Sequence, residues 1–192
     1  MKKLIISLFL LCLIVLNGCV TPGYMVSTKT DEFEGYTTID LQSNELPDKD
    51  MWNLLSVSIN KWNFGIRKFI SKSGEISYLI KLLYFGDGWV FIDSGQSLHI
   101  LADDNHINLS GEGSFKNRDV VYGDIVSETA FYPIKKAQIK KIADAATVKI
   151  KVDGQEGYVT AEFGAENIEQ VKKFYIENIV TQKEILNAIS SK

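Results

Sequence analysis

Both histidines of this chain lie in one short segment together with carboxylates. The segment reads His99-Ile100-Leu101-Ala102-Asp103-Asp104-Asn105-His106. Imidazole and carboxylate groups are ligands that zinc and manganese accept, and Asp103 and His106 are the candidate ligands here. A histidine beside a carboxylate can also act as a general base, so His99 and His106 are the candidate bases of a hydrolase.

The spacing argues against a single metal site that uses both histidines. Asp104-Asn105 predicts the two-residue turn of a hairpin, which would pair Asp103 with His106 across the strands. His99 would then lie four residues further along its strand, roughly 13 Å away at about 3.3 Å per residue. Zinc ligands must converge within about 2 Å of one ion. We therefore expect a polar hairpin tip with an Asp103–His106 pair, and no metal or cofactor.

Other catalytic patterns are incomplete. The segment Ser110-Gly111-Glu112-Gly113-Ser114 is rich in glycine but lacks the lysine of a phosphate-binding loop. No Gly-x-Ser-x-Gly sequence occurs, and a serine triad would have to take its base from His99 or His106. The sequence thus predicts a non-enzymatic protein with no assigned catalytic residue, and a hydrolase is the alternative.

The charge pattern excludes a nucleic-acid-binding protein. The net charge is -3, and the chain contains no strongly basic block. The densest basic region lies between residues 135 and 151, where four lysines are candidates for a surface that contacts anionic headgroups or an acidic partner. These are Lys136, Lys140, Lys149 and Lys151. The alternative is that they form the solvated face of a helix and of the strand beside it.

The first residues of the chain have the pattern of a secretory signal. Lys2 and Lys3 precede an apolar run from Leu4 to Leu16. This run is too short for a membrane-spanning helix, which needs roughly 20 residues. The sequence Leu16-Asn17-Gly18-Cys19 that ends it resembles the lipobox of bacterial lipoproteins, although Asn17 departs from the usual small or aliphatic residue.

The resemblance implies cleavage before Cys19, a diacylglycerol on its sulfur and an acyl chain on its amine, which together hold the protein at a membrane. In enteric-type lipoproteins an aspartate directly after the lipidated cysteine resembles a signal for retention in the inner membrane. This chain has Val20 at that position, which favours the outer membrane. We therefore expect an envelope lipoprotein of the outer membrane that faces the periplasm, if the organism is Gram-negative. Cys19 would be the only cysteine of the mature chain, which excludes a disulfide framework and thiol catalysis.

The predicted organisation is a signal peptide over residues 1–18, a lipidated cysteine and tether over 19–30, and one domain over 31–192. Its apolar patterns predict an α+β fold, with a mostly antiparallel sheet and two or three helices concentrated toward the C-terminus. Gly86-Asp87-Gly88 predicts a hairpin turn. Three tryptophans and their aromatic neighbours predict core packing, or else a groove for a partner. The strands are expected over 31–41, 54–62, 66–70, 76–85, 89–92, 98–101, 106–109, 120–134, 147–152 and 158–163, and the helices over 134–146, from Glu166 onward and over 181–192.

Overall fold

The computed structural model describes residues 23–47, 60–155 and 157–181. Within these ranges the chain forms ten strands, two α-helices and one π-helical turn. The fold is α+β, with antiparallel sheets and with the helices near the C-terminus, as the sequence predicts. The third helix expected over 181–192 lies outside the described residues apart from Thr181 and stays a prediction.

The larger sheet has six strands in the order β1-β2-β3-β4-β8-β7, and all neighbours are antiparallel. Its edges are therefore β1 and β7. The strands are β1 (Met25–Asp31), β2 (Tyr36–Gln42), β3 (Asn60–Ile70), β4 (Ile76–Gly86), β8 (Ile125–Pro133) and β7 (Arg118–Tyr122).

The smaller sheet has four antiparallel strands in the order β10-β9-β5-β6. They are β10 (Gly157–Glu162), β9 (Val148–Gly154), β5 (Gly95–Ala102) and β6 (Asn105–Gly111). Helix α2 (Lys136–Asp144) lies between β8 and β9, and helix α3 (Ala165–Phe174) follows β10 and runs into the π-helical turn η2 (Tyr175–Ile179).

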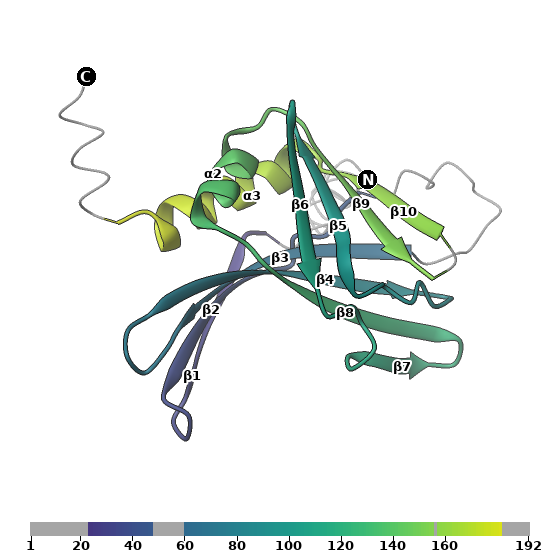
Figure 1. Cartoon of the computed structure of the whole chain (residues 1–192), viewed down its shortest axis with the longest axis horizontal. Helices are drawn as coiled ribbons and strands as arrows, with labels where there is room; N and C mark the ends of the chain where they lie inside the picture. The colour runs from purple at the N-terminus through teal and green to yellow at the C-terminus, as the bar shows by residue number, and fades with distance from the viewer. Residues whose placement is uncertain (1–22, 48–59, 156, 182–192) are drawn as a thin grey trace, which may run out of the picture.

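The smaller sheet and the helices cover the same side of the larger sheet (Figure 1). The helices lie toward the β1–β2 end and the smaller sheet lies toward the β7–β8 end. Phe64 and Leu82 of the larger sheet, Ile150 of the smaller sheet, and Ile139 and Phe174 of the helices are almost fully buried in one hydrophobic cluster. Alternation along each strand sends such residues inward and leaves the intervening side chains on the outer faces.

Several aromatic side chains take the core positions that the sequence predicts. Trp62 and Tyr84 are buried, and their ring centroids lie 4.9 Å apart across β3 and β4. Phe64 meets Phe163 edge to face at the same centroid distance. Trp52 lies outside the described residues.

The prediction of a tether that reaches Thr30 is wrong from Met25 onward, because β1 pairs with β2 over its whole length. The strand predicted over 31–41 is interrupted, since residues 32–35 form the turn between β1 and β2. Of the strand predicted over 54–62, residues 60–62 are described, and they begin β3, which continues to Ile70.

The hairpin predicted at Gly86-Asp87-Gly88 is also absent. Strand β4 pairs with β3 and β8, and residues 87–94 leave the sheet as a loop that makes one bridge, between Ile92 and Gly154. Since β3 and β8 occupy both sides of β4, no edge remains for residues 89–92, and the Glu128 carboxylate on β8 binds three backbone N–H groups of this loop.

Candidate functional site

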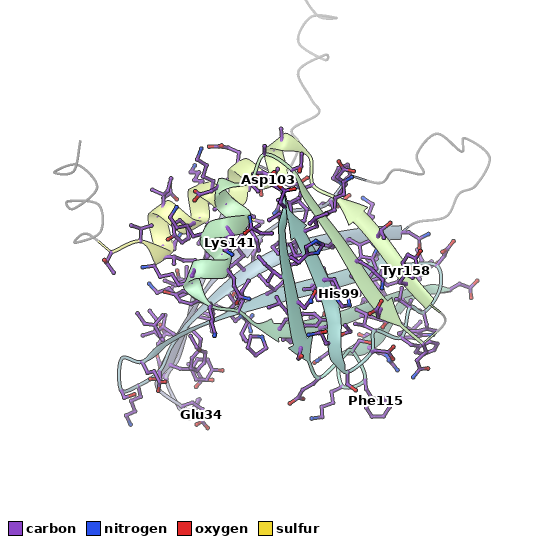
Figure 2. The ribbon with its side chains drawn as sticks, turned by 45° about the horizontal axis from the view of Figure 1, so that its top comes forward. Glu34, His99, Asp103, Phe115, Lys141 and Tyr158 are labelled. Atoms are coloured by element: carbon purple, nitrogen blue, oxygen red, sulfur yellow. The ribbon has the colours of Figure 1, made fainter. Side chains whose placement is uncertain are left out.

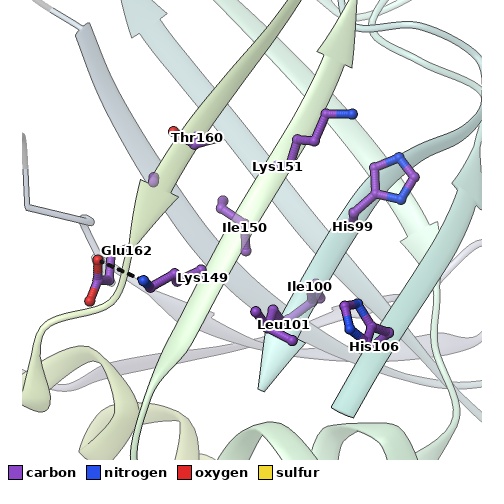
Figure 3. Close-up of a pocket in the computed structure, with 10 residues that line it drawn as sticks. His99, Ile100, Leu101, His106, Lys149, Ile150, Lys151, Thr160 and Glu162 are labelled. Carbon is purple, nitrogen blue, oxygen red and sulfur yellow. Dashed lines mark ion pairs between the residues drawn. The ribbon is translucent and has the colours of Figure 1, made fainter. Parts of the chain in front are cut away.

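The exposed side of the four-stranded sheet carries both histidines and a concentration of charge. We call this side the outer face. Its side chains line up across the strands because the register sets Leu101 opposite both His106 and Lys149, and His99 opposite both Asn108 and Lys151. A pocket of about 420 Å³ opens on it, lined by both histidines, both lysines, Thr160 and Glu162 among others (Figure 3). The outer face comprises His99, Leu101, His106, Asn108, Lys149, Lys151, Asp153, Tyr158, Thr160 and Glu162.

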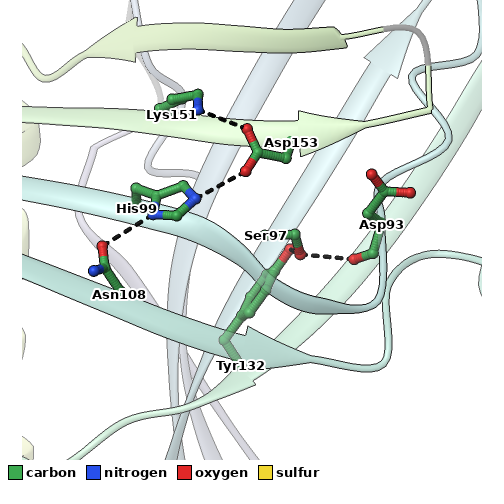
Figure 4. A network of polar contacts seen from close by, with 7 residues as sticks. All are labelled: Asp93, Ser97, His99, Asn108, Tyr132, Lys151 and Asp153. Atoms are coloured by element: carbon green, nitrogen blue, oxygen red, sulfur yellow. Dashed lines mark hydrogen bonds and ion pairs between the residues drawn. The ribbon is translucent and has the colours of Figure 1, made fainter.

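His99 lies at the centre of a hydrogen-bond network on this face (Figure 4). Its Nε2 is 2.8 Å from Asp153 Oδ2 and its Nδ1 is 2.9 Å from Asn108 Oδ1. Lys151 Nζ lies 2.9 Å from the other carboxylate oxygen of Asp153. Three strands thus fix the imidazole ring through both of its nitrogens.

The charges on the outer face are paired. The hydrogen bond from Lys151 lowers the pKa of Asp153, and His99 adds to this effect against the opposing effect of partial burial. Lys149 lies 3.8 Å from Glu162 across β9 and β10, and the Lys151 ammonium lies 4.8 Å from the centroid of the Tyr158 ring. The face therefore offers two cations that are each already balanced by a carboxylate.

The β5–β6 hairpin differs by one residue from the prediction. Ala102 pairs with Asn105 and Leu101 pairs with His106, so the turn is Asp103-Asp104 and not Asp104-Asn105. The predicted Asp103–His106 pair is wrong for this reason. His106 becomes a diagonal neighbour of His99, about 7–8 Å away, closer than the predicted separation.

Asp103 has a different role in the structure. Its backbone takes a positive φ of 49°, and its carboxylate accepts hydrogen bonds from the N–H groups of Thr147 at 2.9 Å and of Ala146 at 3.1 Å. These bonds lower the pKa of Asp103, the one from Thr147 most strongly. Among the described residues no group of three or more His, Cys, Asp or Glu side chains is placed to hold a metal ion.

The four candidate lysines lie on two elements of the fold. Lys149 and Lys151 belong to the outer face, whereas Lys136 and Lys140 belong to helix α2, where Lys140 pairs with Asp144. Figure 2 labels His99 on the smaller sheet and Lys141 on helix α2. The lipidation candidate, Cys19, lies outside the described residues.

The serine that lies closest to His99 along the chain does not form a nucleophile–base pair with it. Ser97 is buried, its hydroxyl donates to the backbone carbonyl of Asp93 at 2.6 Å, and it lies 3.1 Å from the Tyr132 hydroxyl (Figure 4). The imidazole of His99 instead contacts Asn108 and Asp153. A catalytic triad would need a nucleophile on the ring nitrogen of His99 that faces away from Asp153. That nitrogen contacts the Asn108 side-chain amide instead.

Sequence reasoning missed the most buried charged group of the described structure, Glu128. Its carboxylate accepts backbone N–H bonds from Val90, Phe91 and Ile92 at 2.6, 2.8 and 3.0 Å and a bond from the Ser114 hydroxyl at 2.5 Å. The signal was present in β8, where Val126, Glu128, Ala130 and Tyr132 occupy alternate positions and three of the four are apolar or aromatic. Because all these partners lie in loops, Glu128 holds the two loops to β8. We call Glu128, Ser114 and the N–H groups of residues 90–92 the clasp.

Comparison of the chain with protein-family models, with curated proteins and with solved structures gives no match.

Proposed function

We propose that this protein is a lipid-anchored component of the bacterial cell envelope and that its domain is a non-enzymatic binding or assembly module. The observation that carries the proposal is the sequence Leu16-Asn17-Gly18-Cys19 behind a basic and then apolar start. In a Gram-negative organism Val20 favours the outer membrane, with the domain in the periplasm. The membrane is one partner, through the lipid on Cys19, and an envelope protein is the other.

The beginning of the described chain supports a short attachment. The Tyr24 hydroxyl donates to Glu177 at 2.8 Å, and the Lys173 ammonium lies 4.3 Å from the centroid of the Tyr24 ring. The chain is therefore fixed to the domain five residues after Cys19, and five extended residues reach about 18 Å at most. None of the helices in the described ranges has both the length and the apolar character needed to cross a bilayer.

The outer face supports binding over catalysis. His99 is held at both ring nitrogens, and the pocket around it is lined by charges that already have partners. Binding of an acidic segment would exchange the Lys149–Glu162 contact for a new one at little net cost, because exposed ion pairs contribute about 0–1 kcal/mol.

The first test is the location of the full-length protein. The natural chain is expected in the membrane fraction and the Cys19→Ser variant in the soluble fraction, and equal partition of the two would contradict the anchor. Binding is tested separately by crosslinking in intact cells, where a product heavier than the monomer is expected. Recovery of the monomer alone would contradict the binding module.

A hydrolase is the second candidate function, because His99 and Asp153 form a histidine–carboxylate pair beside a pocket. We expect no turnover of ester, phosphoester or glycoside test substrates by the natural chain. Turnover that disappears in both His99→Ala and Asp153→Asn would replace the binding module with this alternative.

A further inference from the structure

Strand β7 combines an unpaired sheet edge with exposed apolar side chains. Val120, Val121 and Tyr122 are 58%, 51% and 83% exposed, and Phe115 in the preceding loop is 80% exposed. As the last strand of the six-stranded sheet, β7 also presents backbone N–H and C=O groups that no neighbouring strand takes up in the part of the chain that the structure describes. Figure 2 shows Phe115 projecting from this end of the molecule.

The other edges in the described ranges are more polar. Strand β6 exposes His106, Asn108 and Ser110, and β10 has Tyr158 as its one strongly exposed large apolar side chain. Strand β1 exposes Thr28, Lys29 and Thr30, and its exposed apolar side chain is Met25 at its first position. Charged and polar edges resist pairing with other chains, whereas an apolar edge favours it. Strand β7 is therefore the edge in the described structure that is best suited to pair with another strand.

The clasp around Glu128 holds this edge in position. Arg118, the first residue of β7, lies 3.6 Å from the Glu128 carboxylate and donates to the Ser114 hydroxyl at 3.0 Å. Its guanidinium also lies 4.7 Å from the centroid of the Phe91 ring and 5.8 Å from that of Phe115. A strand that is fixed before binding loses less conformational freedom when it pairs.

We propose that β7 pairs in antiparallel orientation with β7 of a second copy of this chain, about a two-fold axis at Val120. In this register Val120 faces Val120 of the other copy, and Asp119 faces Val121. Arg118 of one copy faces Tyr122 of the other, while its guanidinium stays on Glu128 and Ser114 of its own chain. Just beyond the strand, Lys116 faces Asp124, so the two ends of the contact have complementary charge.

Neighbouring symmetric registers are less favourable. A two-fold axis at Asp119 would set two carboxylates directly opposite each other, which is destabilising. An axis at Val121 would fall on the register irregularity between Val120 and Tyr122, where the strand bends. The axis at Val120 avoids the charge clash and centres the contact on a residue that pairs regularly with Val126 of β8.

The position of β7 suits two anchored copies, and the strength of the contact in cells rests on the proposed membrane anchor. Strands β1 and β7 lie at opposite edges of the sheet (Figure 1), five strand spacings apart, or about 24 Å. A pairing of five-residue strands buries little area and is weak in dilute solution. Confinement of both copies to one membrane raises their effective concentration and favours pairing.

The test is a disulfide between identical positions in the full-length protein in intact cells. Val120→Cys is expected to give a dimer on a non-reducing gel, because the two Val120 positions face each other. Thr28→Cys on β1, the other edge of the larger sheet, is the matched control and should stay monomeric. Equal dimer in the two variants, or a Val120→Cys adduct with a different protein, would overturn the pairing. Dimer in the natural chain would show an unmodified Cys19 thiol, a failure of the anchor and not of the pairing.

A second test adds a charge to the β7 edge and introduces no new cysteine. Val120→Lys places two ammonium groups opposite each other. In cells treated with a crosslinker that does not react with amines, the amount of crosslinked dimer should fall at least about tenfold. Thr28→Lys adds the same charge to β1, the other edge of the larger sheet, and should leave the dimer unchanged. A Val120→Lys variant that crosslinks as well as the natural chain would rule out the contact.

Discussion

Glu128 is a carboxylate with no exposed surface, and its partners show how one side chain can fix two loops. It binds the N–H groups of residues 90–92 and the hydroxyl of Ser114, and it lies beside the Arg118 guanidinium. Glu128→Gln keeps the shape but replaces an acceptor with an amide donor and leaves Arg118 without its charged partner. We expect a loss of about 3–5 kcal/mol in the free energy of unfolding, measured by chemical denaturation.

An exposed ion pair provides the control for Glu128. Glu45 and Lys61 lie 2.9 Å apart, with about half of each side chain exposed. Glu45→Gln should lower the free energy of unfolding by about 0–1 kcal/mol, since water screens such pairs. Similar losses in the two variants would show that Glu128 does not act as a buried clasp.

Asp153 makes the outer face sensitive to acid. Its folded-state pKa is below the ordinary value of 3.8, because Lys151 and His99 favour the carboxylate. The ionised group therefore stabilises the fold above about pH 4, and this contribution is lost as the pH falls through the folded-state pKa. The free energy of unfolding, measured from neutral pH into acid, should fall less steeply in Asp153→Asn and in Lys151→Gln than in the natural chain. Unchanged acid dependence in both variants would contradict this.

At the scale of elements, the sequence predicts best where local pattern alone decides the structure. Strand β9 and helix α2 follow from alternation and from the spacing of apolar residues, and the hairpin of β5 and β6 follows from its polar turn. The register of that hairpin does not follow from the residues of the turn, because Asp and Asn both tolerate the positive φ that such a turn needs. Contacts of Asp103 with residues more than forty positions later select the observed turn.

Distant contacts also explain the other failures of prediction at this scale. A glycine-rich turn at residues 86–88 is compatible with a hairpin or with a loop, and the pairing of β4 with both β3 and β8 leaves no edge for a returning strand. Likewise the central contact of the candidate site joins His99 to Asp153, which lies 54 residues away. The sequence indicates His99 as a candidate, but no local pattern indicates the partner that orients it.

The turn at Asp103 connects the smaller sheet to the segment between α2 and β9. Asp103 both accepts hydrogen bonds from that segment and takes a positive φ, and we expect substitutions to separate these two roles. Asp103→Ala removes the acceptor of the Ala146 and Thr147 bonds and places a less tolerant residue at φ 49°. Asp103→Asn keeps an acceptor oxygen and the tolerance of positive φ. Thermal unfolding should show a drop of a few degrees in Tm for Asp103→Ala and a smaller drop for Asp103→Asn. Equal changes would assign the effect to charge alone.

At the scale of the whole molecule, one continuous core joins the larger sheet to both elements that cover it. Phe64 of β3 has no exposed surface and meets Phe163, which connects β10 to α3. The contact therefore lies where the larger sheet, the smaller sheet and the helices come together. A core shared in this way predicts that the described elements unfold as one cooperative unit.

Phe64→Ala tests that cooperativity. Removing the ring opens a cavity between the larger sheet and Phe163, and we expect a loss of about 3–5 kcal/mol in the free energy of unfolding. With Trp52 and Trp89 replaced by phenylalanine, tryptophan fluorescence reports on the larger sheet through Trp62, and far-ultraviolet circular dichroism reports on the helices as well. The two transitions should shift together and stay coincident. Phe33→Ala removes a fully exposed ring of the same size and should leave both transitions unchanged. If fluorescence and circular dichroism separate in Phe64→Ala, the larger sheet and its cover unfold independently, and the shared core does not couple them.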